Sequence, residues 1–411
     1  MIGYRLSELA TPLQGRLLGG DAAFTRVSTD TRTLQPGDLF VPLQGPRFDG
    51  HDHLDAARLR GAVGALVSRG GAHPLPALKV ADTLAGLGAL ARLWRQESPA
   101  PVVAVTGSNG KTTVKEMLAS ILGLQAEVLS TRGNLNNAVG LPLTLLRLQQ
   151  QRWAVVEMGA SAPGEIGYLS DIARPDLALL INAGRAHLEG FGSVEGVARA
   201  KAEILRGLKA GGFFVYNADD PFAPLWAELA AGWPTRTFGI RARADVVSPE
   251  PALELRWEGD GFVSRFPVHC ASGEMEIELS LAGQHNRLNA LAAIAAAEAL
   301  GVGPETIRAG LKRLRPVAGR LRPLRGRGGA RLIDDTYNAN PDSVMAAIAV
   351  LTQLPGRPLL VLGELAEMGV EGPRFYREIG TRAREAGVRA LYALGGAGAA
   401  VAGFGPGGRG F

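Results

Sequence analysis

The sequence predicts an α/β protein of three domains, the central one built on a mostly parallel sheet. Three observations predict this: the chain has 411 residues, strand-like and helix-like runs alternate along most of it, and a glycine-rich turn separates one such strand from its helix. We expect a small α/β domain at 1–81, a central domain at 82–314 and a third domain at 315–411.

Composition and charge narrow the class of protein. Hydrophobic residues make up 46% and charged residues 20% of the chain, which is typical of core-forming domains. The sequence has no apolar run of eighteen residues and no secretory signal in "MIGYRLSELATPL", and a single cysteine, Cys270, excludes an internal disulfide. We expect a cytoplasmic protein without membrane insertion.

Positive charge is in slight excess, with a net charge of +5. The densest basic stretch, "KRLRPVAGRLRPLRGRGGARL" at 312–332, lacks interleaved aromatic residues for base stacking, so we expect a solvated loop and no nucleic-acid partner. Only six of the 44 basic residues are lysines. A retained lysine such as Lys111 or Lys201 indicates a need for a compact amine or one that can lose its proton.

The first domain combines the strand-like runs "GDLFVPL" and "GALVS" with the helical "HDHLDAARLRG". Residues 27–57, which include "GDLFVPL" and the start of this helical run, are dense in polar residues and glycine between the apolar segments. This density favours a binding loop over the alternative, an ordinary turn-rich connection.

The central domain begins with a helical pattern at 82–97, which "SPAP" ends. The expected strands that follow are "WAVVEMG", "LALLIN" and "GFFVYNAD", and the expected helices are "SVEGVARAKAEILRGL" and "NRLNALAAIAAAEALG". This alternation predicts a parallel sheet with helices on both faces, interrupted by a β-rich stretch at about 235–282.

The third domain is predicted to be Rossmann-like. The runs "ARLIDDTYNANPDSVMAAIAVL", "RPLLVLGELAEMG" and "VRALYALGG" read as strand, helix, strand, helix and strand. The final residues, 397–411, are low in complexity, and we expect them to form a tail.

The most informative stretch is "VVAVTGSNGKTTVKEM", at 102–117. A strand, a glycine turn and a helix N-terminus together form an anion site, in which Lys111 can reach nucleotide phosphates and Thr112 can ligate magnesium. The usual loop has four residues between its glycines, whereas Gly107 and Gly110 enclose two and Val105 replaces the first glycine. The alternative is a glycine turn with a chance lysine. The order of features favours a P-loop ATPase-like central domain.

Three further residues are candidates for metal chemistry. Glu157 ends a predicted strand, where a carboxylate points into the crevice at the edge of a parallel sheet, and His187 lies in a glycine-flanked loop at the same edge. A lysine that has lost its proton can react with carbon dioxide to form a carbamate, an anionic oxygen ligand, so Lys201 is the third candidate. The alternatives are a solvated glutamate, a structural histidine and a surface lysine paired with Glu203 or Glu195.

The motifs taken together resemble the Mur ligase family over roughly residues 25–395. They are "TGSNGKTT", "GNLNNAVGLPLTLL", "VVEMGA", "AHLEGFGS", "AKAEIL", "GQHNRLNALAA", "GRL", "DDTYNANPDS" and "VLGELAEMG". The resemblance implies a monomeric ATP-dependent ligase that joins D-alanyl-D-alanine to UDP-N-acetylmuramoyl-tripeptide through an acyl phosphate. The first domain would bind the UDP-sugar, the second ATP, and the third would close with the amine substrate.

The resemblance also implies roles for particular residues. Lys111, Glu157, His187 and Lys201 would be catalytic, and Thr112, Glu157, His187 and a carbamylated Lys201 would hold two Mg²⁺ ions. ATP would contact Gly107, Ser108, Asn109, Gly110, Lys111, Thr112, Thr113, Asn137, Asn286, Arg320, Asp335 and Tyr337. The other substrates would contact Ser28, Asp30, Arg32, Phe48, Asp49, Gly50, His51, Asn338 and Asn340.

Other classes of protein stay open at this point. Another Mur ligase or a folylpolyglutamate-type amide ligase shares the central motifs, and a P-loop switch without ligase activity shares the loop. No Ser-His-Asp arrangement or cysteine-rich zinc site is evident in the sequence. The family usually continues with another strand and a basic "KGSR"-like segment, so we expect the end of the third domain to be missing or altered.

Overall fold

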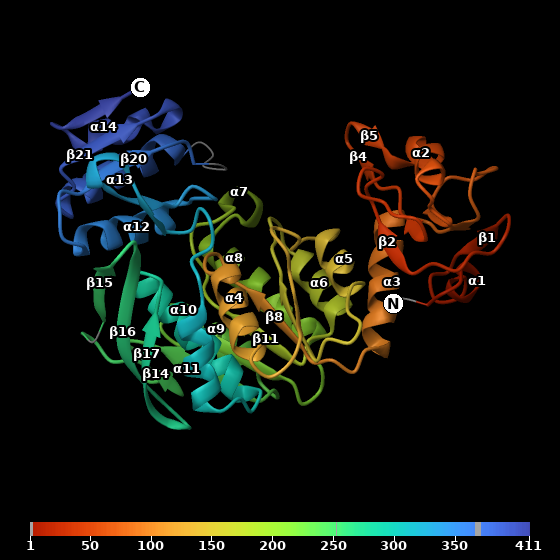
Figure 1. The fold of residues 1–411 in the computed structure, drawn as a ribbon, viewed down its shortest axis with the longest axis horizontal. Helices are drawn as coiled ribbons and strands as arrows, with labels where there is room; N and C mark the ends of the chain where they lie inside the picture. Colours follow the sequence, from red (N-terminus) through yellow and green to blue (C-terminus); the bar gives the residue numbers. More distant parts are fainter. Residues whose placement is uncertain (1–2, 252, 366–370) are drawn as a thin grey trace.

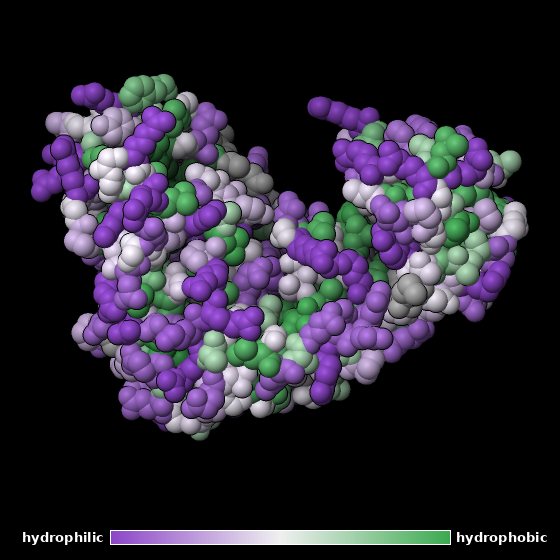
Figure 2. Space-filling model, viewed as in Figure 1, coloured by the Kyte–Doolittle hydropathy of each residue, from purple (hydrophilic) through white to green (hydrophobic). Residues whose placement is uncertain are grey.

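The computed structural model describes residues 3–251, 253–365 and 371–411. It confirms an α/β protein of three parts (Figure 1). The first and third parts stand on opposite sides of the central part. A space-filling view shows a deep hollow between them (Figure 2). Among the described residues, no helix has both the length and the apolar character needed to cross a bilayer.

The first part is a small twisted sheet with two short helices. Its strands lie in the order β1 (Arg16–Leu18), β7 (Ala77–Lys79), β6 (Gly64–Val67), β3 (Asp38–Phe40) and β2 (Arg26–Ser28). The helices are α1 (Leu6–Leu9) and α2 (Leu54–Leu59), the latter after the 3-10 turn η1 (Gly50–His53). A separate hairpin, β4 (Gln44–Gly45) and β5 (Phe48–Asp49), lies within the predicted binding stretch.

Helix α3 (Thr83–Glu97) joins the first part to the central part. Its Gly86 lies against Leu66 of the first part, and its Gly88 lies against Tyr168 of the central part, where an added Cβ would approach the Tyr168 hydroxyl to 2.3 Å. The helix therefore packs on both parts, and the predicted boundary between 81 and 82 stays a prediction.

The central sheet carries the predicted parallel core. Its parallel strands are β9 (Val128–Ser130), β10 (Trp153–Glu157), β8 (Val102–Thr106), β11 (Leu177–Leu180), β12 (Phe213–Asn217), β13 (Thr235–Gly239) and β14 (Val246–Val247), in that order. The inner strands β10, β8, β11 and β12 are short, mostly apolar and almost wholly buried, as expected for a sheet that helices cover on both faces. The β-rich stretch is confirmed as an antiparallel extension, β15 (Glu254–Glu258), β16 (Gly261–Cys270) and β17 (Gly273–Leu279).

Two helical layers cover this sheet because alternate strand residues point to opposite faces. Val103 and Val105 of β8 pack on one face, with α4 (Lys111–Leu122), α10 (Gln284–Ala299) and α11 (Pro304–Arg313). Val102 and Ala104 pack on the other face, with α3 and with α5 (Gly140–Leu145), α6 (Glu165–Ala173), α8 (Val194–Ala202) and α9 (Ala223–Leu229). The short α7 (Leu188–Phe191) precedes α8, and the 3-10 turn η2 (Glu203–Gly207) follows it.

The third part differs from the predicted order of strands. Its parallel sheet is β20 (Leu359–Leu362), β21 (Ala390–Ala393) and β22 (Gly408–Gly410), with helices α12 (Pro341–Gln353), α13 (Gly372–Glu385) and α14 (Ala399–Phe404). The strand predicted to open this sheet, β19 (Arg331–Asp334), instead forms an antiparallel hairpin with β18 (Arg322–Arg325). Its Ile333 packs with Phe262 and Leu321 rather than with the core of the third part. Residues 366–369 of "VLGELAEMG" lie outside the described residues.

The prediction of a tail at 397–411 was wrong. These residues form α14 and β22, with a 3-10 turn η5 (Gly395–Gly398) before them, and Ala397, Ala400 and Phe404 are buried in the core. Small residues permit this packing: an added Cβ on Gly380 of α13 would lie 1.9 Å from the Ala400 carbonyl oxygen, and one on Gly403 would lie 2.0 Å from that of Arg377. Low complexity here reflects close contact between two helices.

Candidate active site

The glycine turn lies between β8 and the N-terminus of α4, as its sequence predicts. Gly110 is the N-cap of α4 with a φ of +86°, and a Cβ there would lie 2.4 Å from Asn289 Oδ1. Both the backbone angle and the space require glycine. Lys111 Nζ donates hydrogen bonds to the carbonyl oxygens of Gly107 (2.7 Å) and Ser108 (3.3 Å), so its ammonium lies over the turn.

Thr112 and Glu157 form the polar centre of the site. The Thr112 hydroxyl donates to Glu157 Oε2 at 2.9 Å, and Asn136 Nδ2 donates to Oε1 at 2.8 Å. The Glu157 backbone N–H donates to Thr131 Oγ1 at 2.9 Å, which fixes the end of β10. Glu157 is only 3% exposed, so its carboxylate is buried and oriented by hydrogen bonds beside the helix N-terminus.

Sequence reasoning missed Asn136 and Asn182. Asn182 accepts two hydrogen bonds from the glycine turn. Its Oδ1 accepts from the Asn109 backbone N–H at 2.9 Å, and its carbonyl oxygen accepts from the Ser108 backbone N–H at 3.1 Å. It follows the buried strand β11, and a polar residue at a strand end was the same signal that identified Glu157. Asn136 lay beside a predicted residue, Asn137, and no pattern distinguished the two.

Residues of the third part reach this centre. Arg320 Nη2 donates to Thr112 Oγ1 at 3.0 Å, and the Arg320 guanidinium lies 4.4 Å from the centroid of the Tyr337 ring. Asp335 Oδ1 accepts from the Leu321 backbone N–H at 3.1 Å, and burial raises the pKa of this carboxyl. Asn340 Nδ2 donates to Asn109 Oδ1 at 2.8 Å.

A cavity of about 1630 Å³ joins these groups. Most predicted nucleotide residues line it: Ser108, Asn109, Gly110, Lys111, Thr112, Thr113, Asn137, Asn286, Arg320, Asp335 and Tyr337, together with Asn338, Asn340, Glu157 and His187. Gly107, Lys201 and the predicted residues of the first part are not among the residues that line it.

Two lining asparagines also have local structural contacts. Asn137 Oδ1 accepts from the backbone N–H of Gly140 at 2.9 Å, at the start of α5. Asn286 Nδ2 donates to the Ala282 carbonyl at 2.8 Å, and its Oδ1 accepts from Asn289 at 3.1 Å. These hydrogen bonds position both side chains at the wall of the cavity.

His187 and Lys201 lie on either side of α7. His187 has a φ of +52°, a conformation that a non-glycine residue adopts only where its surroundings stabilise it. Lys201, on α8, is 2% exposed, and its Nζ lies 5.5 Å from the centroid of the Phe191 ring. Burial, aided by the charge of Lys111, lowers the pKa of Lys201 to about 7, so a large share of this amine is neutral at physiological pH.

The pKa of Lys111 is lowered, like that of Lys201. Burial lowers the pKa of its ammonium, while the charge of Glu157 acts to raise it and that of Arg320 to lower it. Cationic groups at this end of the cavity therefore repel one another, and a bound anion would relieve that repulsion.

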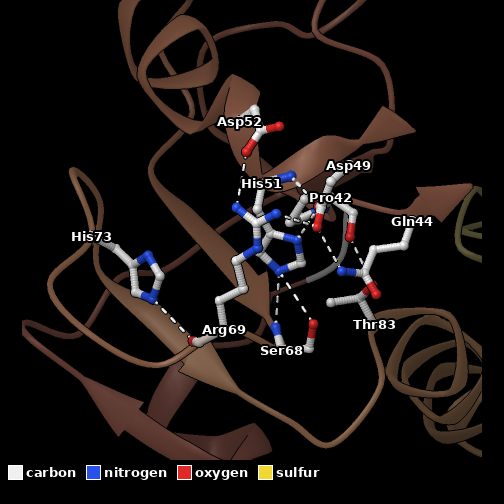
Figure 3. Close-up of polar contacts among 9 residues, drawn as sticks. All are labelled: Pro42, Gln44, Asp49, His51, Asp52, Ser68, Arg69, His73 and Thr83. Atoms are coloured by element: carbon white, nitrogen blue, oxygen red, sulfur yellow. Dashed lines mark hydrogen bonds and ion pairs between the residues drawn. The ribbon is translucent and has the colours of Figure 1, made fainter. Parts of the chain in front are cut away.

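Two predicted residues of the "FDGH" segment, Asp49 and His51, contact each other and also neighbouring residues of the first part (Figure 3). Asp49 Oδ1 lies 2.6 Å from His51 Nδ1, and its Oδ2 accepts from Gln44 (2.6 Å) and Arg69 (2.5 Å). Burial acts to raise the pKa of Asp49, but the hydrogen bonds from Gln44 and His51 outweigh it and lower the pKa. Gly50 lies against Leu43, and Phe48 is 61% exposed.

The same group contains a Ser-His-Asp chain of contacts that the sequence did not reveal. His51 Nε2 accepts from the Ser68 backbone N–H at 3.0 Å, while Ser68 Oγ lies farther away at 3.4 Å. Because the backbone N–H occupies the Nε2 lone pair and the His51 side chain is 1% exposed, the histidine cannot act as a base toward Ser68. The chain of contacts anchors β5 to the end of β6.

The other predicted residues of the first part form a turn after β2. Ser28 Oγ donates to the Asp30 carbonyl at 3.1 Å, and Arg32 makes an ion pair with Asp30 at 2.7 Å. The hydrogen bond from Arg32 lowers the pKa of Asp30. The Arg32 side chain is 85% exposed, so it is available to a ligand.

The donor set at Thr112 and Glu157 suits magnesium. Mg²⁺ prefers oxygen ligands and usually takes one or two from protein carboxylates and hydroxyls, with phosphates and water as the rest. Within the described residues, no three His, Cys, Asp or Glu side chains form a metal cluster by themselves. This site would therefore complete its coordination with nucleotide oxygens.

The fold and site define a class: nucleotide-binding α/β proteins in which a third domain reaches the phosphate loop. Three family descriptions match the chain, "Mur ligase family, catalytic domain" at residues 23–97, "Mur ligase middle domain" at 105–297 and "Mur ligase, glutamate ligase domain" at 319–403. The chain belongs to the Mur ligase family.

Proteins of known name are similar to this chain over nearly its whole length. The UDP-N-acetylmuramoyl-tripeptide--D-alanyl-D-alanine ligase of Escherichia coli K12 is 42% identical over 96% of this chain and 86% of its own length. The ligase of the same name from Bacillus subtilis is 38% identical over 92% of this chain and 82% of its own length. The crystal structure of MurF from Acinetobacter baumannii is 36% identical with a TM-score of 0.94, covering 100% of this chain and 90% of its own. MurF ligase from Thermotoga maritima in complex with ADP is 32% identical with a TM-score of 0.80, covering 90% and 84%.

Proposed function

We propose that this chain is an ATP-dependent ligase that joins D-alanyl-D-alanine to UDP-N-acetylmuramoyl-tripeptide and releases ADP and phosphate. The observation that carries the proposal is the convergence of the phosphate loop, the buried Glu157 and side chains of the third part on one cavity. Identity of 42% and 38% to ligases of that name supports the choice of substrates.

The chemistry follows from the weakness of a carboxylate as an acylating agent, because its leaving group would be oxide. In the proposed reaction a substrate carboxylate oxygen attacks the γ-phosphorus of ATP, which releases ADP and forms an acyl phosphate. The unprotonated amine of the dipeptide attacks the acyl carbon, and the tetrahedral intermediate releases phosphate as the amide bond forms. Lys111 and the N–H groups at the start of α4 would stabilise the phosphate charge.

Metal binding is part of the proposal. Thr112 and Glu157 would hold one Mg²⁺ ion, and His187 and a carbamylated Lys201 would hold a second. The low pKa of Lys201 supports the carbamate, because only a neutral amine reacts with carbon dioxide. When bound, Mg²⁺ would supply positive charge beside the transferring phosphoryl group.

Positioning of the other substrates is also proposed. Ser28, Asp30, Arg32 and residues 48–51 would bind the UDP-sugar, whereas Tyr337, Asn338 and Asn340 would lie near adenine and the incoming dipeptide. Closure of the first and third parts over the hollow would exclude water, which would otherwise hydrolyse the acyl phosphate. The cytoplasmic location, the monomeric state and the lack of a nucleic-acid partner stay predictions.

The test is phosphate release from ATP with UDP-N-acetylmuramoyl-tripeptide held fixed. D-alanyl-D-alanine, single amino acids and no amine are compared. We expect rapid release only with the dipeptide. Release with D-glutamate or L-lysine, but not with the dipeptide, would assign the chain to a different ligase, and release without any amine would indicate a nucleotide hydrolase.

A further inference from the structure

Arg185 makes an unusually complete contact with a residue of the third part. Its Nε and Nη2 donate to Asp342 Oδ1 at 2.9 and 2.7 Å, and its backbone N–H donates to Oδ2 at 3.0 Å. One carboxylate thus accepts three hydrogen bonds from one residue that lies 157 positions away in the sequence. Charge-assisted hydrogen bonds in such a set are stronger and more directional than a single ion pair.

A second element of the third part extends this contact. Arg185 Nη1 lies 3.4 Å from Glu378 Oε2, and its guanidinium carbon lies 5.5 Å from the centroid of the Phe375 ring, both on α13. Asp342 lies in the first turn of α12. Arg185 therefore contacts two helices of the third part at once, with side chains of Arg185 and Asp342 that are 31% and 34% exposed.

Residues next to Arg185 and residues next to Asp342 both hydrogen-bond to the phosphate loop. The backbone N–H of Gly184, the residue before Arg185, donates to Ser108 Oγ at 2.9 Å. Asn340, the N-cap of α12 and two residues before Asp342, donates to Asn109 Oδ1 at 2.8 Å. A Cβ on Gly184 would lie 3.0 Å from Asp342 Oδ2, so a glycine at this position permits the close approach.

We propose that Arg185 is a positioning residue, which with Asp342 and Glu378 clamps the third part against the phosphate loop. The clamp sets the distance between Asn340 and Asn109 and keeps Arg320 within reach of Thr112. Arg185 and Asp342 are part of the cavity wall, and the clamp contributes affinity for the nucleotide by keeping that cavity assembled before ATP binds. Its effect on activity rests on the proposed function, whereas its effect on domain position does not.

The test uses Arg185→Met, Asp342→Asn and the double variant. Met keeps an apolar side chain beside Phe375, and Asn can still accept the Arg185 backbone N–H. Arg382→Met is the matched control, because Arg382 makes an exposed ion pair with Glu385 on the same helix as Glu378. Domain position is read by single-molecule FRET between dyes on Cys270 and on an Arg374→Cys substitution, in all four variants and in the parent chain.

Each single variant should shift the FRET distribution toward longer distances and raise the KM for ATP about 5- to 20-fold, with kcat changed less than about 3-fold. The KM of the double variant for ATP should lie within about 2-fold of that of each single variant, because the two residues act as one unit. Raising the ionic strength from about 0.05 to 0.5 M should shift the parent chain toward the variants. Arg382→Met should match the parent chain.

An unchanged FRET distribution and an unchanged KM in both single variants would overturn the clamp. Effects of the two substitutions that multiply in the double variant would also overturn it, because the residues would then act separately. If the parent chain lacks ligase activity but the FRET shift occurs, the clamp stands and the proposed function fails.

Discussion

The Thr112 hydroxyl and the Glu157 carboxylate, 45 residues apart in the sequence, are joined by a hydrogen bond of 2.9 Å. The same hydroxyl oxygen accepts a hydrogen bond from Arg320 of the third part. A helix N-terminus, a strand end and a separate domain thus meet at one oxygen atom.

Glu157→Gln should lower kcat/KM for ATP by about 100-fold or more and raise the Mg²⁺ concentration needed for half-maximal phosphate release. The amide keeps the size of the side chain but removes the charge that Mg²⁺ requires. A magnesium titration of phosphate release measures the change. Glu127→Gln, which removes an exposed carboxylate, should behave as the parent chain. A Glu157→Gln variant with an unaltered magnesium requirement would show that this carboxylate does not serve a metal.

Lys201→Ala should lose activity and regain part of it when a short-chain carboxylate such as acetate is added. The added carboxylate would replace the anionic oxygens of the carbamate in the buried space that the side chain leaves. The matched control is Lys312→Ala, since Lys312 is 68% exposed in an ion pair with Glu278. Acetate should not change its activity. Full activity of Lys201→Ala without acetate would rule out a carbamate ligand.

The stability of the protein should fall between about pH 6.5 and 4 in part because of His285. Burial lowers the pKa of His285 from 6.5 to about 4. Between these values the unfolded chain binds a proton that the folded chain does not, so the free energy of unfolding decreases as the pH falls. The His285→Gln variant should lose on the order of 1–3 kcal/mol of this pH dependence. The free energy of unfolding is measured by denaturant titration at several pH values. An equal dependence of this free energy on pH in both proteins would contradict the prediction.

Gly380→Ala should destabilise the third part by about 1–3 kcal/mol, although alanine favours a helix by about 1 kcal/mol. The added Cβ would lie 1.9 Å from the Ala400 carbonyl oxygen and force α13 and α14 apart. Thermal unfolding measures the loss. Gly398→Ala is the control, because a Cβ there meets no atom within 4 Å. A stabilised Gly380→Ala variant would mean that the two helices do not pack this closely.

The sequence predicts the phosphate loop and Glu157 because both depend on local order. A strand followed by a glycine turn and a helix is recognisable from consecutive residues alone, and a polar residue at a strand end faces the crevice. Family motifs added residues such as Arg320 and Asn340, whose side chains line the same cavity. No local pattern could have indicated that Arg320 contacts Thr112, because 208 positions separate them.

Other features depend on packing that spacing does not reveal. The tail prediction was wrong because glycine and alanine, which read as low complexity, allow two helices to approach closely. The strand at 331–334 was assigned to the wrong sheet because its residues alone do not specify its partner, the strand at 322–325. The hydrogen bonds of Asp49 and His51 to Gln44, Arg69 and Ser68 could not be predicted, because only the folded chain brings these residues together. A role of Asp49 and His51 in substrate binding stays a prediction.

The most direct measurement follows oxygen from the substrate to phosphate. UDP-N-acetylmuramoyl-tripeptide labelled with ¹⁸O in both oxygens of the reacting carboxylate is turned over with ATP and D-alanyl-D-alanine, and the released phosphate is analysed by mass spectrometry. An acyl phosphate transfers one labelled oxygen to each phosphate, which is the result that the account predicts. Phosphate without ¹⁸O, formed at the rate of amide synthesis, would contradict it.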